Sequence, residues 1–104
     1  FVNKAAIAGD RHGTLTWGAA QAGVASGIAA ALADGTIPSD QADDLLIVAA
    51  VWVDPAAGDE EAVFANQRGA ARGAIVAAVR GEPSPDAVAR AADAPANPYF
   101  RRGR

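Results

Sequence analysis

The feature that most constrains the fold is an unbroken apolar run, LLIVAAVWV, that extends from Leu45 to Val53. The run is rich in β-branched residues and ends at Asp54 and Pro55, which together predict a strand over residues 45–53. Because no polar residue alternates with the apolar ones, we expect this strand to be covered on both faces. Helices would cover one face, and a subunit interface could cover the other.

A second, shorter strand is predicted at residues 1–7, with Lys4 in its middle, and a loop is predicted at residues 9–13. Two strands alone are too few for a stable sheet. We therefore expect further strands, either ahead of Phe1 or from a partner chain. The first residue is not methionine, which also suggests that sequence is missing ahead of it.

The first predicted helix is capped by Thr14 or Thr16 and extends to about Asp34. Two of its glycines, Gly23 and Gly27, are four residues apart and therefore share one face of the helix. Glycine costs helix stability relative to alanine. The pair therefore indicates that another backbone, from a sheet or a neighbouring helix, packs closely against this face.

A second long helix is predicted from a cap at Asp59 to Arg80, where Gly81 ends it. A short third helix is predicted to start at residues 84–86 (SPD), with proline at its first helical position. Residues 94–104 are expected to form an extended tail. The two long helices are also supported by apolar residues at helical spacing, such as Val24 and Ile28 in the first and Val76 and Val79 in the second.

The predicted order of strand, helix, strand, helix and short helix indicates one α+β domain over residues 1–104. In this arrangement the two long helices and the short C-terminal helix cover a small sheet. Hydrophobic residues make up 51% of the chain, and alanine supplies most of them. Because each alanine buries little area, a core of this kind often gains stability from oligomerisation.

The composition excludes several classes of function. The chain has no cysteine, which excludes thiol catalysis, disulfides and cysteine-ligated zinc, and its single histidine cannot form a histidine cluster around a metal. The formal charge of −3 argues against a nucleic-acid partner. No apolar run reaches the length of a membrane span and no signal peptide is evident. We expect a cytoplasmic protein with no metal and no membrane partner.

Four segments resemble motifs of one known family. Asn3-Lys4 with Ile7 resembles its NKxTI strand, and residues 18–25 (GAAQAGVA) resemble its helix start GPAQHGVA. Residues 34–45 (DGTIPSDQADDL) resemble EGIIPADEADDL, the most diagnostic segment, and residues 81–83 match GEP. The intervals between these segments fit without gaps. On these motifs the chain resembles roughly the C-terminal two-thirds of a formaldehyde-activating enzyme.

The resemblance implies an α+β domain that assembles as a ring-like homo-oligomer, with the active site between subunits. The implied reaction condenses formaldehyde with a pterin of the tetrahydromethanopterin type. A pterin nitrogen attacks formaldehyde, and the resulting carbinolamine must lose water, which requires a proton donor. In the family this general acid is a histidine in an N-terminal segment that would lie before Phe1. The resemblance therefore leaves the catalytic residue unknown in this chain.

The resemblance implies that Lys4 and Gln21 bind the pterin. Lys4 matches the family lysine that lines the pterin pocket, where an ammonium could hold a polar edge of the ring. Taken alone, Lys4 could also be a strand lysine that guards an exposed sheet edge. Gln21 matches the family glutamine, whose amide can donate and accept hydrogen bonds. Taken alone, Gln21 could be an ordinary polar residue in the first turns of a helix.

Two departures from the family pattern remove polar groups from the expected pocket. Ala6 occupies the place of a family threonine, and Ala22 occupies the place of a family histidine. These changes leave room for a different or bulkier ligand. They favour, as an alternative, a non-catalytic or redirected homologue that binds a small aldehyde adduct or a heterocycle. A further alternative is one half of a split or processed protein, completed by an N-terminal companion segment or chain.

Other residues could carry chemistry but have simpler explanations. His12 could titrate near neutrality, but a histidine in a loop is expected at the surface. Trp17 and Trp52 are expected as core or interface anchors, with stacking on a flat heterocycle as a second interpretation. An acidic cluster suggests a hard cation, although a turn at residues 37–44, capped by Ser39, explains it better. The cluster consists of Asp40, Asp43 and Asp44.

Overall fold

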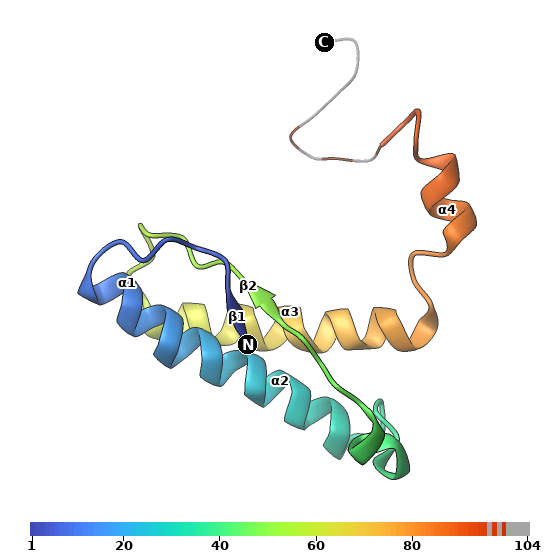
Figure 1. Cartoon of the computed structure of the whole chain (residues 1–104), viewed down its shortest axis with the longest axis horizontal. Coiled ribbons are helices and arrows are strands. Elements are labelled where there is room, and N and C mark those ends of the chain that lie inside the picture. Colours follow the sequence, from blue (N-terminus) through green and yellow to red (C-terminus); the bar gives the residue numbers. More distant parts are fainter. Residues whose placement is uncertain (96, 98, 100–104) are drawn as a thin grey trace.

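The computed structural model of the chain describes residues 1–95, 97 and 99. Two long helical segments lie against each other, and a pair of short strands runs across them (Figure 1). A short helix lies beyond the C-terminal end of the second long helix (Figure 1). This α+β architecture, with a small sheet and several helices, confirms the predicted fold class.

The sheet consists of two strands, β1 (Val2–Asn3) and β2 (Ala50–Val51), which are parallel. Val2 lies opposite Ala50, and Asn3 lies opposite Val51. Both strands are much shorter than predicted. Ladder hydrogen bonds need a neighbouring strand. In the described part of the chain residues 45–49 belong to no strand, although the Ala49 carbonyl oxygen accepts the Val2 N–H at 2.7 Å. The apolar run therefore has a high propensity for a strand, but most of it has no neighbouring strand with which to form ladder hydrogen bonds.

The described residues cover one face of the β2 region and leave the other exposed. Val51 and Val53 are buried in the core, whereas Trp52 is 58% exposed and Leu46 is 89% exposed. The helices thus cover the face of Val51 and Val53, as expected. The subunit interface expected on the second face stays a prediction.

The first helical segment is continuous from residue 10 to residue 33. It consists of α1 (Asp10–Thr14), a π-helical part η1 (Leu15–Ala20) and α2 (Gln21–Ala33). The predicted loop at residues 9–13 and the predicted caps at Thr14 or Thr16 are wrong. Gly9 makes the turn with a φ of 88°. The Thr16 hydroxyl donates to the His12 carbonyl oxygen at 2.8 Å and is buried.

The second long helix, α3 (Glu60–Arg80), confirms its prediction. The Asp59 carboxylate accepts the Ala62 N–H at 3.1 Å, which satisfies one of the unpaired donors of the first turn. At the other end Gly81 adopts the left-handed conformation, with a φ of 67°. That conformation is favourable for glycine and ends the helix.

The short helix α4 (Pro85–Arg90) also follows its prediction, since the Ser84 hydroxyl accepts the Ala87 N–H at 3.1 Å. Residues 37–44 include the 3-10 helix η2 (Ser39–Asp44), whose capping position is Pro38 and not Ser39. The expected extended tail falls mainly on residues 96, 98 and 100–104, which lie outside the described residues.

The close backbone approach predicted from Gly23 and Gly27 is confirmed, and the partner is α3. A Cβ atom on Gly23 would lie 2.5 Å from the carbonyl oxygen of Phe64. A Cβ atom on Gly27 would lie 2.5 Å from the carbonyl oxygen of Arg68. Both distances are far below ordinary contact, so these glycines set the separation of the two helices.

The segment Asp10–Ala33 is also long and apolar enough, at 24 residues, to cross a membrane by length and composition. The expectation that no apolar stretch reaches that length is therefore corrected. The segment packs against α3, and it contributes Leu15, Ala20 and Val24 to a core cluster with Val51 and Val53. This packing accounts for the buried part of the segment's apolar surface.

Candidate functional site

Lys4 follows β1 directly and stands on a backbone that is held on both sides. Its own N–H donates to the Val51 carbonyl oxygen at 2.8 Å. The Asn3 side chain then bonds to Ala5 twice: Nδ2 donates to the Ala5 carbonyl oxygen at 2.8 Å, and Oδ1 accepts the Ala5 N–H at 2.9 Å. The Asn3-Lys4 pair thus presents an exposed amine from a fixed main chain.

Strand alternation decides which way Lys4 faces. Asn3 and Val51 are register partners on the side of the core, so Val2 and Lys4 belong to the outer face of the strand pair, together with Trp52. Lys4 is also the only lysine in the chain, since the remaining basic residues are all arginines. Its ammonium is therefore the only side-chain primary amine available for binding.

Gln21 is the first residue of α2 and is exposed. It directly follows the π-helical part η1, a local feature that is common at functional sites. Trp17 lies one turn before Gln21 and is 52% exposed. Four depressions in the described residues are lined by neither Lys4 nor Gln21. Both side chains are exposed on the surface of the described part of the chain.

An open depression of about 600 Å³ lies between the loop after β1 and the start of the first helical segment. Asp10, Thr14 and Trp17 line it from the helix, at spacings of four and three residues that share one helical face. Ile7 lines it from the loop and packs over Gly13. The sequence prediction missed Asp10 and Thr14 because it placed a loop where α1 begins.

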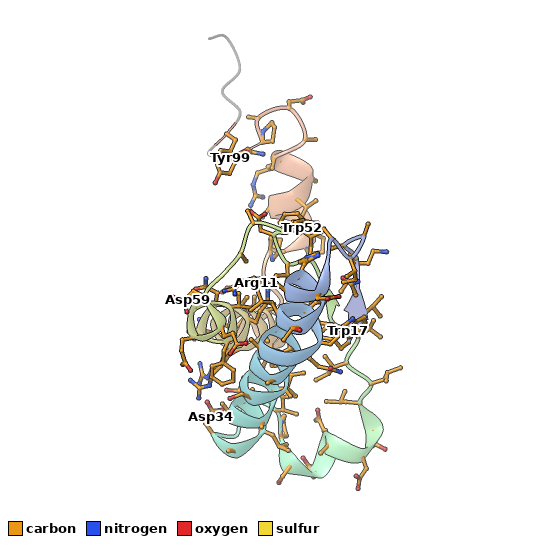
Figure 2. The ribbon with its side chains drawn as sticks, turned by 90° about the vertical axis from the view of Figure 1, so that its left-hand side faces the viewer. Arg11, Trp17, Asp34, Trp52, Asp59 and Tyr99 are labelled. Carbon is orange, nitrogen blue, oxygen red and sulfur yellow. The ribbon has the colours of Figure 1, made fainter. Side chains whose placement is uncertain are left out.

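Trp17 is held from one side by Phe1, with ring centroids 5.8 Å apart and planes inclined by 58°. Figure 2 shows Trp17 on the side of its helix away from Asp59 and α3. Both tryptophans are more than half exposed in this chain, so the expected role as core anchors is wrong. Their alternative roles as interface or stacking residues stay predictions.

His12 is not the surface residue that the sequence predicted, because it lies in α1 and is only 2% exposed. Its Nδ1 accepts the Ala8 N–H at 2.9 Å, which requires a lone pair there and places the proton on Nε2. Nε2 then donates to the Val53 carbonyl oxygen at 2.7 Å. Both ring nitrogens are occupied by the backbone, so His12 connects the loop, α1 and the end of β2.

A second depression, of about 500 Å³, lies between the first helical segment and the start of α3. Ala22, which replaces a family histidine, lines it together with Gly18 and Ala19. Glu60, Glu61 and Phe64 line the opposite side. The small side chain of Ala22 therefore leaves this depression open on that side.

Among the described residues, Asp34 has a carboxylate whose pKa is clearly lowered. Hydrogen bonds from the Thr36 hydroxyl at 2.6 Å and from the Thr36 N–H at 2.9 Å lower its pKa to about 2, and the Arg72 guanidinium adds to the effect. Figure 2 shows Asp34 at the far end of the helix from Arg11, so this network lies away from the candidate site. No group of three or more metal-binding side chains is present in the described residues.

Comparison with known proteins gives the family. The family model described as "Formaldehyde-activating enzyme (Fae)" matches residues 1–100. The chain belongs to the formaldehyde-activating enzyme family. The match includes the segments of Lys4 and Gln21 and confirms the resemblance drawn from the motifs.

Three relatives show how the family members compare with this chain. A 5,6,7,8-tetrahydromethanopterin hydro-lyase from Methanosarcina barkeri is 33% identical over 99 residues, which are 95% of this chain and 56% of that protein. A bifunctional enzyme Fae/Hps from Methanosarcina mazei is 40% identical over 72 residues, 69% of this chain and 18% of that protein. Another Fae/Hps, from Archaeoglobus fulgidus, is 32% identical over 102 residues, 98% of this chain and 26% of that protein.

The chain thus spans about half the length of the hydro-lyase and a smaller share of the bifunctional enzymes. No solved structure gave a significant match. The places of Lys4 and Gln21 are therefore described from the structure of this chain alone.

Proposed function

We propose that the protein containing this chain condenses formaldehyde with a pterin of the tetrahydromethanopterin type and releases water. The observation that carries the proposal is the family match over residues 1–100, which includes Lys4 and Gln21. Both side chains are exposed and therefore available to a ligand or to a neighbouring subunit. The hydro-lyase named among the relatives acts, by its name, on the same pterin.

The roles that we assign follow from the chemistry of the two side chains. The Lys4 ammonium carries three donors and one positive charge, so it binds a carbonyl oxygen or an anionic edge of the pterin. The Gln21 amide donates and accepts together, so it matches an edge that offers both kinds of group. Both residues bind and orient the pterin, which brings its nitrogen into position for formaldehyde.

The proton for the departing hydroxyl comes from outside this chain in our proposal. His12 is the single histidine, and both of its nitrogens are bonded to backbone groups. We therefore assign the general acid to an N-terminal companion segment or chain, as the family pattern implies. The site would then lie between subunits of a cytoplasmic homo-oligomer, with no nucleic-acid or membrane partner.

The test is the formation of the methylene adduct by the complete gene product that contains this chain. We expect formaldehyde and tetrahydromethanopterin to condense faster than the spontaneous rate. Lys4→Met should lower kcat/KM about tenfold or more, since a hydrogen bond to a charged group contributes about 1.5–3 kcal/mol. Arg90→Gln on α4 is the matched loss of a positive charge and should leave the rate unchanged. A wild-type rate equal to the spontaneous one would exclude the enzyme.

A second candidate function is binding without turnover, favoured by the open depression beside Ala22 and by Ala6 at a polar family position. In that case the complete gene product would bind a pterin or an aldehyde adduct but would not accelerate the condensation. Ala22→His distinguishes the two, because restoring the imidazole should raise kcat/KM only if the site performs the reaction.

A further inference from the structure

The depression formed by Ile7, Asp10, Gly13, Thr14 and Trp17 is neither assigned by the family motifs nor used by Lys4 and Gln21. It combines an aromatic face with one free carboxylate. Trp17 is half exposed and is held by Phe1 on one side. The Asp10 carboxylate is exposed and makes no hydrogen bond or ion pair in the part of the chain that the structure describes.

We infer that this depression is the subsite that reads the pyrimidine edge of the pterin. The ring stacks on the indole of Trp17, and the Asp10 carboxylate accepts hydrogen bonds from the 2-amino group and from N3–H. The inference rests on the proposed function and adds to it a specificity-determining pair of residues.

The chemistry of the two partners supports this assignment. A 2-amino-4-oxo pyrimidine presents two parallel N–H donors on one edge, and a carboxylate presents two acceptor oxygens at a matching spacing. A flat bicyclic ring gains from an offset arrangement on an aromatic face. The Thr14 hydroxyl lies in the same lining and can accept or donate at the adjacent oxygen or nitrogen.

The depression also lies close to the segments of Lys4 and Gln21, as a second part of the same pterin site would. Gln21 follows Trp17 by four residues along the same helical segment, so the two lie on adjacent turns. Ile7 follows Lys4 by three residues in the loop that passes over Gly13. A ring held at Trp17 would therefore extend between the two segments that carry the family residues.

The acidic residue is what separates this subsite from a merely apolar hollow. Without Asp10, the lining would offer a tryptophan ring, an isoleucine and one hydroxyl, which do not distinguish one flat ring from another. A carboxylate rejects a ring that presents only acceptors on that edge, because its oxygens then face unpaired acceptors. The inference therefore predicts selectivity as well as binding.

Calorimetric titration of the chain with two probes tests the inference. Pterin carries the two N–H donors, whereas 1,3-dimethyllumazine has a similar flat ring but no N–H on that edge. We expect the wild-type chain to bind pterin about tenfold more tightly, which is the effect of hydrogen bonds to a charged group. Asp10→Asn should remove this preference, and the matched exposed variant Asp40→Asn should keep it.

Two tryptophan variants test stacking separately. Trp17→Leu should weaken both probes to a similar extent, because both rings stack, and Trp17→Phe should restore most of the affinity. In a Trp52→Phe background, Trp17 is the only tryptophan, and its indole N–H resonance should shift on addition of either probe.

Equal affinity for the two probes, or a preference that survives Asp10→Asn, would overturn the inference. Those results would leave the proposed function intact, since it is judged by condensation in the complete gene product. Absence of any pterin binding to the chain would also overturn the inference.

Discussion

His12 has both nitrogens of its ring in hydrogen bonds to backbone groups, Ala8 N–H on one side and the Val53 carbonyl on the other. These two bonds cross the start of the first helical segment and connect the loop after β1 to the end of β2. The single histidine of the chain is therefore engaged in structure. The sequence alone could not predict this structural role, because the fold determines which backbone groups lie next to the His12 ring.

We predict that His12→Ala destabilises the chain by about 2–4 kcal/mol, since it leaves the buried Val53 carbonyl and the part-buried Ala8 N–H without partners. Urea unfolding followed by circular dichroism would measure the change. Gln41→Ala, at an exposed position in η2, should change the free energy of unfolding by less than about 0.5 kcal/mol. Equal stability of the His12 variant and the wild type would show that the two bonds contribute little.

The lowered pKa of Asp34 predicts that the folding stability of the chain depends on pH in the acid range. Its pKa is lowered to about 2 by the Thr36 hydroxyl, the Thr36 N–H and Arg72, below the ordinary 3.8. Because the folded state favours the charged form, the carboxylate contributes stability that is fully present above about pH 4. That contribution is lost as the pH falls through about 2.

The stability difference between wild type and Asp34→Asn should therefore be largest near neutral pH and shrink below pH 4. Thermal unfolding at a series of pH values would measure it, at low ionic strength because the site is exposed. A difference that stays constant from neutral pH to pH 2 would contradict the assigned cause.

At the scale of the elements, the contact between α2 and α3 depends on two glycines. Gly23→Ala or Gly27→Ala would place a Cβ atom 2.5 Å from a carbonyl oxygen of α3. We predict that each substitution destabilises the chain by about 1–3 kcal/mol, because overpacking outweighs the gain in helix propensity.

Gly69 and Gly73 are the matched controls, since both lie in α3 and a Cβ atom at either position would have no neighbour within 4 Å. Gly69→Ala and Gly73→Ala should stabilise the chain by about 0.5–1 kcal/mol through helix propensity alone. Chemical denaturation of all four variants compares them directly. The same sign at all four positions would refute the close approach of the helices.

The elements differ in how much of them the sequence could predict. The ends of α3 were predicted correctly because Asp59 and Gly81 act on the neighbouring backbone, which is local. The strand at residues 45–53 was overpredicted because a strand needs a hydrogen-bonding neighbour that composition cannot supply. The helix start at Asp10 was missed because glycine and aspartate around it are typical of loops, while the His12–Val53 bond that fixes α1 spans 41 residues.

The candidate site was predictable to a similar extent. Lys4 and Gln21 came from local motifs, and the family match covers both segments. The depression lined by Asp10 and Trp17 was not predictable, because it requires α1 in place of a loop. With the helix begun at Asp10, the spacing of Asp10, Thr14 and Trp17 would have indicated one shared face.

At the scale of the whole molecule, the outer side of the strand region is an apolar surface in this protomer. Leu46, Val48 and Trp52 are all exposed along this segment, and Val48 also lines the apolar cavity that the segment forms with α2 and α3. Such a surface is typical of an interaction site. It fits the expectation that the chain works as part of a larger assembly.

We predict that the chain self-associates and that Leu46→Lys with Val48→Lys shifts it toward the monomer, because two charges cannot be buried without partners. Analytical ultracentrifugation would give the molar mass in solution. Val88→Lys on α4, also at an exposed apolar position, is the control and should leave the mass unchanged. If the wild-type chain is a monomer in solution, the outer strand face is not an interface between copies of this chain.

The central claim is that this chain carries the pterin-binding residues of a formaldehyde-activating enzyme. The most direct test is a titration of the isotope-labelled chain with a tetrahydropterin, followed through its backbone amide resonances. We expect the resonances of Asn3–Ala5 and Trp17–Gln21 to shift and those of α4 to stay unchanged. Shifts confined to α4 or η2, or no shift at saturating ligand, would contradict it.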